Sequence, residues 1–219
     1  MKAVKFIILS LIILALNMPV FADVMPYYTN NIDKHTIGFV QVPKNFVVYT
    51  LPKSESKIAD SIFASDYEVK LTKKTLEPSE VFAVQSLNND LTFCAVIDEE
   101  DGGWYKIIYD KKSNKSGWIK PQSQYDFWGL KDFLSYFGKR YGLYYMKNID
   151  YRKRGLYSGA ESDAQKIGSF TLIKNIRLNK LSGNWALVTV TDLGCLPKIG
   201  YIQWRESDGT IILFPKIAE

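Results

Sequence analysis

The sequence predicts a mainly β protein made of two sheet domains with the same plan, joined by an amphipathic helix. Two pairs of glycine-aromatic stretches predict the sheets: Gly103 to Ile108 with Gly117 to Ile119, and Gly183 to Val188 with Gly200 to Trp204. In each stretch the glycine can end a loop at no steric cost, and alternating apolar residues then line one face of a strand. The repeated plan predicts an internal duplication. A helical period over residues 126–141, between the two halves, predicts the connecting helix.

Residues 1–22 have the pattern of a secretory signal peptide. Two lysines precede an apolar run from Phe6 to Phe21, and small residues follow at the spacing of a cleavage site. The run contains Asn17 and Pro19 and is shorter than the roughly 20 clean apolar residues that cross a bilayer. We therefore expect a cleaved signal rather than a retained anchor, a secreted or periplasmic protein, and no stable membrane span after cleavage.

The charge of the chain argues against a nucleic-acid partner. It has 28 basic and 23 acidic residues, and two of the basic ones, Lys2 and Lys5, lie in the signal, which leaves a net charge of +3. The remaining basic residues are scattered among acidic ones, with small clusters only at 111–115 and 152–154. Such scattering is typical of solvated loops. Aromatic residues are more numerous than two small cores need, so some are expected at the surface, where they commonly form binding sites.

The first domain is predicted over residues 38–121, after a flexible lead-in at 23–37 that holds the only histidine, His35. Alternating apolar residues predict strands near 39–42, 46–49, 67–71, 81–84 and 91–97. Pro52 closes the second of these strands because proline cannot donate to a sheet ladder. The acidic run from Asp98 to Asp101 then predicts a solvated hairpin turn.

The connector, residues 122–145, interrupts the strand pattern. Phe127, Leu130, Leu134, Phe137 and Tyr141 recur at steps of 3 and 4, which places them on one stripe of a helix, with Phe133 beside it. We expect Asp126 to cap this helix and Gly138 to weaken its last turn. Because the stripe is so apolar, we expect the helix to pack on both domains. The second domain follows at 146–219.

The two halves differ in length between their aromatic residues. Tyr49 precedes Trp104 by 55 positions, whereas Tyr157 precedes Trp185 by 28. The first half therefore carries an insertion of about one hairpin, by the usual length of short strands and turns. Hairpin loops are expected at 110–116 and 192–198.

This order of features resembles bacterial SH3-like (SH3b) domains, present twice. The resemblance rests on Gly103-Trp104-Tyr105-Lys106-Ile107 with Gly117-Trp118-Ile119, and on Gly183-Asn184-Trp185 with Gly200-Tyr201-Ile202, where Tyr201 replaces the usual tryptophan. It implies two tandem small SH3-like β-barrels joined by the helix. It also implies binding of cell-wall peptides or proteins, in a family that is commonly attached to wall hydrolases. Together with the secretion signal and the lack of a visible catalytic set, it predicts a non-catalytic binding or scaffolding protein of the cell envelope, whose partner is cell-wall peptide, peptidoglycan or an envelope protein.

Four aromatic residues are the candidate ligand-binding residues: Tyr49, Trp104, Tyr157 and Trp185. In SH3-like barrels the two tyrosines would border the groove, and flat rings bind sugar faces and extended peptides alike. We expect Trp118 and Tyr201 to belong to the barrel wall. Trp204 is compatible with either role.

No catalytic residue, metal ligand or cofactor site is predicted. Cys94 falls in the middle of a strand, Cys195 in a loop and His35 in the lead-in, so the sequence shows no cysteine-histidine pair. The run Asp98 to Asp101 lacks the spaced oxygen ligands of a calcium loop. The alternative is a small cell-wall hydrolase that uses a carboxylate pair not visible in sequence. The two cysteines could be bridged or free, and a bridge would have to link the two domains.

Overall fold

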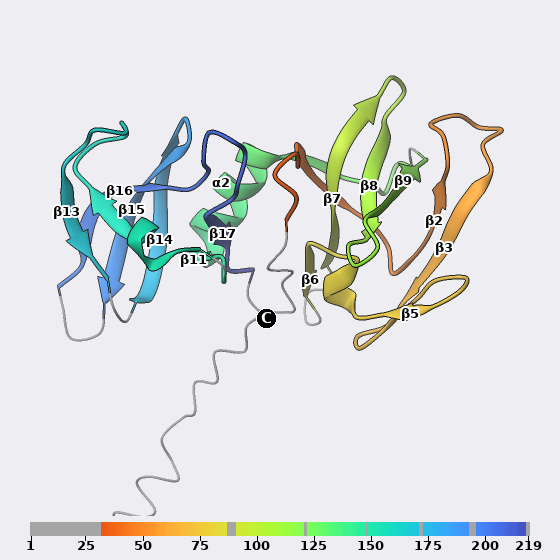
Figure 1. The fold of residues 1–219 in the computed structure, drawn as a ribbon, viewed down its shortest axis with the longest axis horizontal. Helices are drawn as coiled ribbons and strands as arrows, with labels where there is room; N and C mark the ends of the chain where they lie inside the picture. Colours follow the sequence, from red (N-terminus) through yellow and green to blue (C-terminus); the bar gives the residue numbers. More distant parts are fainter. Residues whose placement is uncertain are drawn as a thin grey trace, which may run out of the picture.

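The computed structural model describes residues 32–86, 91–120, 122–147, 149–170, 173–192 and 196–217, without the side chains of Ser86 and Lys174. The predicted signal peptide lies outside the described residues, as does Cys195. Two antiparallel sheets lie side by side along the long axis of the molecule, with the helix α2 (Leu130–Tyr141) between them (Figure 1). The mainly β fold predicted from the sequence is confirmed.

The first sheet has ten strands in the described part of the chain. They are β1 (Gly38–Gln41), β2 (Asn45–Tyr49), β3 (Ile58–Ala64), β4 (Val69–Lys70), β5 (Thr75–Leu76), β6 (Val84–Ser86), β7 (Leu91–Glu100), β8 (Trp104–Asp110), β9 (Lys115–Ile119) and β10 (Phe127–Gly129), with the short 3-10 helix η1 (Pro78–Glu80) before β6. Their order in the sheet is β10-β1-β7-β8-β9-β2-β3-β4-β5, and β6 pairs with β7.

The second sheet has seven strands. They are β11 (Leu143–Tyr145), β12 (Gly155–Tyr157), β13 (Lys166–Ser169), β14 (Ile173–Ser182), β15 (Trp185–Asp192), β16 (Lys198–Gln203) and β17 (Leu213–Pro215), and the 3-10 helix η2 (Tyr151–Lys153) precedes β12. Their order is β13-β12-β16-β15-β14-β11-β17.

The two sheets repeat one topology. Read from β10 to β3, the first sheet matches the second from β17 to β13, strand for strand, in both chain order and sheet order. The first half has in addition β4, β5, η1 and β6 between β3 and β7, where the unequal spacing of the aromatic residues predicts an extra hairpin. The similarity of the two halves thus extends from a few motif residues to the whole strand order.

β-Bulges also recur at matching places. The register shifts between Val48 and Tyr49 on β2, and between Leu156 and Tyr157 on the matching strand β12. It shifts again between Val96 and Asp98 on β7 and at the corresponding point of β14. A bulge bends its strand and increases the local twist, so both sheets curve in the same way. In the described ranges, however, neither path of paired strands returns to its first strand, so no closed barrel forms.

The helix begins later than the sequence predicts. Phe127, Trp128 and Gly129 form β10 and pair with β1, so α2 starts at Leu130, whose amide donates to the carbonyl of Ile37. The predicted cap at Asp126 is wrong: the residue before the helix is Gly129, without a side-chain cap. The later start has a tertiary cause. Pairing with β1 supplies the backbone hydrogen bonds of residues that the helical period alone would have placed in the helix.

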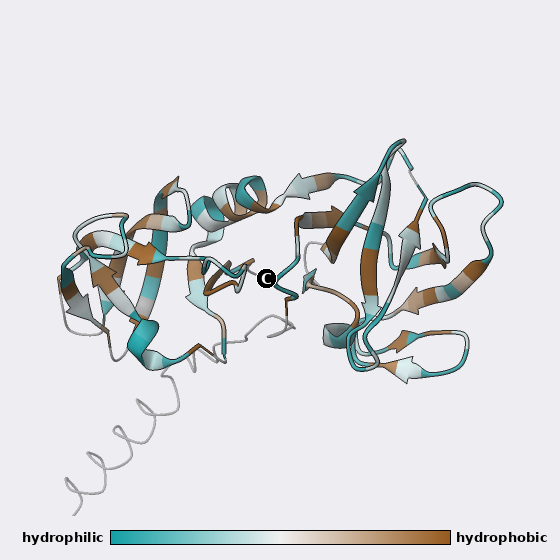
Figure 2. Ribbon diagram, turned by 45° about the horizontal axis from the view of Figure 1, so that its top comes forward, coloured by the Kyte–Doolittle hydropathy of each residue, from teal (hydrophilic) through white to brown (hydrophobic). Residues whose placement is uncertain are grey.

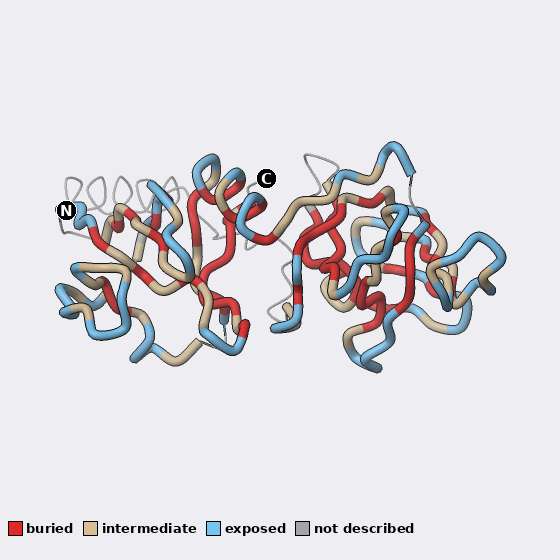
Figure 3. Tube along the Cα trace, turned by 90° about the horizontal axis from the view of Figure 1, so that it is seen from above, coloured by how far each residue is buried: buried red, intermediate tan, exposed pale blue. Residues whose placement is uncertain are grey.

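The helix packs on both sheets, as its apolar stripe predicts. Phe133 is fully buried, with ring centres 4.3 Å from Phe39 and 5.1 Å from Phe93 of the first sheet, and 5.8 Å from Phe214 of the second. These rings belong to one core that combines residues of both halves, and Figures 2 and 3 show apolar and buried stretches in both sheets and in the helix. The two halves are therefore joined by shared packing.

Gly138 allows this close packing. A Cβ there would lie 2.8 Å from Leu143 Cδ2 and 3.0 Å from Leu178 Cδ2, so the missing side chain lets α2 approach β11 and β14. The helix continues past Gly138 to Tyr141.

Among the described residues, no helix combines the length and the apolar character needed to span a membrane.

Candidate functional site

Tyr49 and Trp104 lie against each other on two interior strands of the first sheet. Tyr49 ends β2, Trp104 begins β8, and β9 runs between these strands, with Trp118 directly opposite Tyr49. The rings of Tyr49 and Trp104 meet edge to face, with centres 5.6 Å apart and an interplanar angle of 85°. Such pairs stabilise by about 0.5–1.5 kcal/mol beyond the area that they bury.

Tyr157 and Trp185 form the matching pair in the second sheet. Tyr157 ends β12, Trp185 begins β15, and Tyr201 on β16 lies opposite Tyr157. The ring centres of Tyr157 and Trp185 are 5.5 Å apart at an interplanar angle of 77°. The structure thus brings together the four residues singled out in the sequence as two equivalent pairs, one in each half.

Glycines of two kinds support these pairs. Gly103 and Gly183 have positive φ angles of 77° and 57° in the turns before the tryptophans, as the sequence predicts. Gly117 and Gly200 do not end loops, because they lie within β9 and β16. A Cβ on Gly117 would lie 2.9 Å from the carbonyl oxygen of Tyr49, and a Cβ on Gly200 would lie 2.8 Å from the carbonyl oxygen of Tyr157. Each glycine therefore lets the tyrosine strand approach the glycine-aromatic-isoleucine strand.

The two pairs differ in exposure. Trp104 and Trp118 are each only 7% exposed, and the ammonium of Lys106 lies 5.5 Å from the ring centre of Trp118. In the second half Tyr157, Trp185 and Tyr201 are all half-buried. Tyr49 is half-buried like Tyr157, so the difference between the pairs lies in the tryptophans: Trp185 is more exposed than Trp104.

Polar groups without hydrogen-bond partners lie beside the second pair. The guanidinium of Arg154 lies 5.4 Å from the ring centre of Tyr145, and both the Tyr145 hydroxyl and the Arg154 Nε are buried without a partner. Burial raises the pKa of the Tyr145 hydroxyl, the charge of Arg154 opposes the rise, and Tyr157 adds to it. Buried polar groups are normally hydrogen-bonded, so these two atoms are exceptions, although the Arg154 guanidinium also donates to the carbonyl of Ile149 at 3.4 Å.

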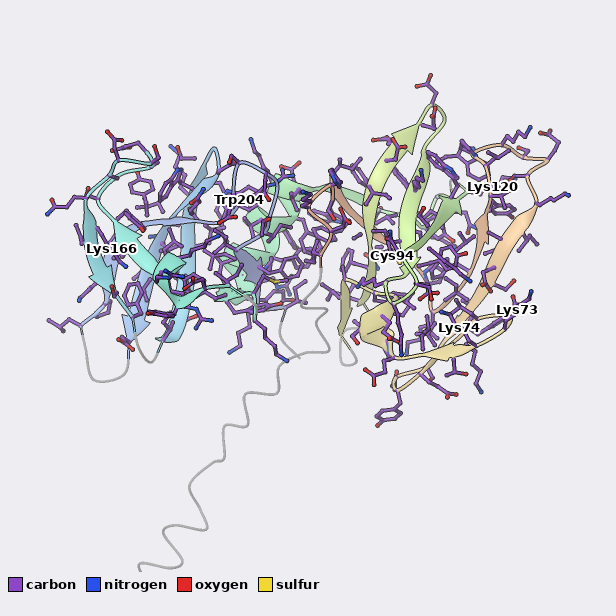
Figure 4. All side chains as sticks on the ribbon, viewed as in Figure 1. Lys73, Lys74, Cys94, Lys120, Lys166 and Trp204 are labelled. Carbon is purple, nitrogen blue, oxygen red and sulfur yellow. The ribbon has the colours of Figure 1, made fainter. Side chains whose placement is uncertain are left out.

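Trp204, by contrast, belongs to the core. It is 1% exposed, and its indole Nε1 donates to the carbonyl of Gly183 at 3.0 Å (labelled in Figure 4). Its position at the end of a strand in the sequence left both roles open, and its burial decides between them.

Two buried carboxylates, Asp60 and Asp110, test the hydrolytic alternative. Asp60 accepts hydrogen bonds from the amide and hydroxyl of Thr72, both at 2.8 Å. Asp110 forms an ion pair with Lys74 and accepts from the amide of Ser113 at 3.1 Å. Burial raises the pKa of Asp110, but these partners outweigh it and hold the pKa below its ordinary value. A general acid at neutral pH needs a raised pKa, so Asp110 does not fit that role. The contacts of both carboxylates hold the inserted hairpin β4–β5 to β3 and β8.

The buried Cys94 and the half-buried Lys111 are a second pair of titratable groups. The thiol of Cys94 is free and fully buried, and burial raises its pKa to about 12, the opposite of what a nucleophilic thiolate requires. Lys111 donates to the carbonyls of Ser79 at 3.0 Å and Phe82 at 2.7 Å, and burial lowers its pKa to about 7. His35 is exposed in the lead-in. Across the described ranges, no three histidine, cysteine or acidic side chains gather to hold a metal ion.

Sequence reasoning did not assign a binding role to the cationic residues near the second pair. Lys166 lies on β13, a four-residue strand whose composition carries no alternation, and Arg154 follows a short 3-10 helix. Only the pairing of β12 with β13 brings Lys166 opposite Tyr157. No family model, curated protein or solved structure matches this chain.

Proposed function

We propose that this protein is a non-catalytic binding or scaffolding protein of the bacterial cell envelope, secreted or periplasmic, that recognises cell-wall peptide or an envelope protein. The observation that carries the proposal is the pair of edge-to-face contacts, Tyr49 with Trp104 and Tyr157 with Trp185, at equivalent places of two equivalent sheets. Two equivalent aromatic pairs at the meeting point of the same three strands are an arrangement that binding surfaces use and that stability alone does not require.

The two halves are, in this proposal, SH3-like units over residues 38–121 and 146–219. The repeated strand order, the bulges beside Tyr49 and Tyr157, and the glycine-aromatic-isoleucine strands support this assignment. The export pattern of residues 1–22 supports the envelope location.

The shared core gives the two pairs a fixed geometry. A single shallow site buries little area and binds weakly, whereas two sites held rigidly can raise the apparent affinity for a polymer by roughly 10² or more when both engage at once. Phe133, which packs against both sheets, would supply that rigidity.

Sedimentation with purified, insoluble cell walls tests the proposal. We expect the exported chain to sediment with the walls, and the variant Tyr157→Ala with Trp185→Ala to bind at least tenfold more weakly. Tyr67→Ala is the control, because Tyr67 is 76% exposed in the turn between β3 and β4, at the end of β3 opposite the one that pairs with Tyr49. Circular dichroism must first show that the double variant is folded.

The outcomes are distinct. A wild-type protein that stays in the supernatant contradicts wall binding and leaves an envelope protein as the partner, which affinity capture from envelope extracts then tests. Release of soluble wall fragments overturns the non-catalytic assignment and establishes the hydrolase.

A further inference from the structure

The strand registers place one equivalent row of side chains across the outer face of each sheet. In the first sheet the row runs from β3 to β7 through Ile58, Tyr49, Trp118, Lys106 and Asp98. In the second it runs from β13 to β14 through Lys166, Tyr157, Tyr201, Leu187 and Lys180. The candidate tyrosines are therefore the second members of two rows that can be compared position by position.

The second row faces away from the core. Tyr157, Tyr201 and Leu187 are half-buried, whereas their chain neighbours on the same strands, including Ala186 and Ile202, are fully buried. The helix covers the opposite face, because Gly138 approaches the buried Leu178 of β14. Alternation along the strands thus leaves the aromatic row open to solvent.

The charges of the two rows differ. In the first, Lys106 lies directly opposite Asp98, so the row contains its own counter-charge. In the second, Lys166 and Lys180 are exposed at the two ends, Arg177 is exposed on the same face opposite Thr189, and the row has no acidic member. Within the described part of the chain, none of these three cations forms an ion pair.

The Lys166 end of the row has further donors. A Cβ on Gly155 would lie 2.8 Å from Lys166 Cε and 3.1 Å from the Tyr157 hydroxyl, so both groups occupy the space beside this glycine. Arg154 immediately precedes Gly155 in the chain. Figure 4 shows Lys166 on β13 at the outer edge of the second sheet. A lysine ammonium beside a tyrosine hydroxyl is suited to a carboxylate.

We propose that the outer face of the second sheet binds an acidic peptide, with the rings of Tyr157, Trp185 and Tyr201 against the peptide planes and Lys166 and Lys180 paired to carboxylates. Neighbouring strands lie about 4.8 Å apart, so the five-strand row spans about 19 Å, which an extended peptide of about six residues covers at about 3.3 Å per residue. This inference rests on the proposed function of the aromatic pairs and adds the charge of the ligand.

Fluorescence anisotropy with a labelled synthetic peptide tests the charge. The probe is an extended hexapeptide with glutamate at both ends, and its comparison peptide has glutamine in those positions and an amidated terminus. We expect the acidic peptide to bind, the neutral peptide to bind at least tenfold more weakly, and added salt to weaken the acidic peptide because exposed charges are screened.

Matched variants locate the site. Lys166→Met and Lys180→Met should each weaken binding of the acidic peptide by about 1.5- to fivefold, the loss expected for one exposed charge pair. Lys73→Met removes the same charge from an exposed position of the inserted hairpin and should leave binding unchanged. Equal binding of the two peptides, or equal binding by all three variants, overturns the proposal.

The other candidate occupant of this face is a second copy of the chain, through its acidic hairpin at Asp98 to Asp101. Sedimentation velocity detects such self-association. Self-association abolished by Lys166→Met would overturn the peptide assignment in favour of that contact. The failure of the acidic-peptide proposal can be told apart from the failure of the proposed function. If the protein binds cell walls but not the acidic peptide, only the proposed charge of the ligand is contradicted. An acidic peptide that binds while walls and envelope extracts do not contradicts the envelope assignment.

Discussion

Phe133→Ala should destabilise both halves of the molecule at once. Phe133 is fully buried, and its ring packs against Phe39 and Phe93 of the first sheet and Phe214 of the second. Truncating a buried phenylalanine costs about 3–5 kcal/mol, because the apolar contacts are lost and the cavity only partly collapses. At about 2–4 °C per kcal/mol for a protein of this length, the melting temperature should fall by about 6–20 °C.

Differential scanning calorimetry checks both the size of the effect and its cooperativity. Because one core contains residues of both sheets, the wild-type protein should unfold in a single transition, and the whole transition should shift in Phe133→Ala. Lys131→Ala, on the exposed side of the same helix, is the control and should change stability by less than about 0.5 kcal/mol. Two transitions in the wild type, with only one of them shifted in the variant, would refute the shared core.

Two further predictions concern single residues. Gly200→Ala should lower the free energy of unfolding by about 1–3 kcal/mol, because its Cβ would lie 2.8 Å from the Tyr157 carbonyl oxygen. The control Gly168→Ala should be tolerated, because its Cβ would meet nothing closer than 3.7 Å. Urea titration measures both free energies, and equal effects would contradict the close-approach argument. Lys111→Met should change how stability depends on pH. The pKa of Lys111 is lowered to about 7 in the folded protein, so the folded state binds fewer protons than the unfolded state from about pH 7 up to the ordinary lysine pKa. The stability of the wild type relative to the variant should therefore rise from pH 7 to pH 10, and parallel pH profiles would show that Lys111 stays charged.

The aromatic pairs could be predicted because their positions follow from local patterns. A turn glycine with positive φ before each tryptophan, and a tyrosine at the end of an alternating strand, fix the ends of β8, β15, β2 and β12 without knowledge of the rest of the chain. The insertion could be predicted in the same way, from the unequal spacing alone.

Features set by contacts distant in sequence could not be predicted. Phe127 to Gly129 continue the helical period, yet they join β1, and nothing within the segment indicates that partner. The strand β14 was missed because its exposed positions, Arg177 and Asn179 among them, make the segment polar, although Ile176 and Leu178 alternate with them and are buried. Lys166 faces Tyr157 only through the pairing of β12 with β13.

The divergence of the two rows follows from how each half uses its charges. In the first half the inserted hairpin takes up the buried charges: Lys74 pairs with Asp110, and Thr72 donates to Asp60. Desolvated charges stabilise only when they are paired, so these residues are committed to holding the insertion. The second half has no insertion to hold, and Lys166, Arg177 and Lys180 remain at its surface.

A duplicated site that kept one ligand would be expected to keep one charge pattern on its outer face. Instead, Lys180 stands where the first half has Asp98, Leu187 where it has Lys106, and Tyr201 where it has Trp118. The fold has kept what shapes the site, namely the bulges, the close-approach glycines and the edge-to-face pairs, while the residues that would contact a ligand have changed. On the proposed function, the two halves are therefore expected to engage chemically different segments of a partner, with the acidic segment on the second sheet, and the helix between them sets how far apart those segments must lie.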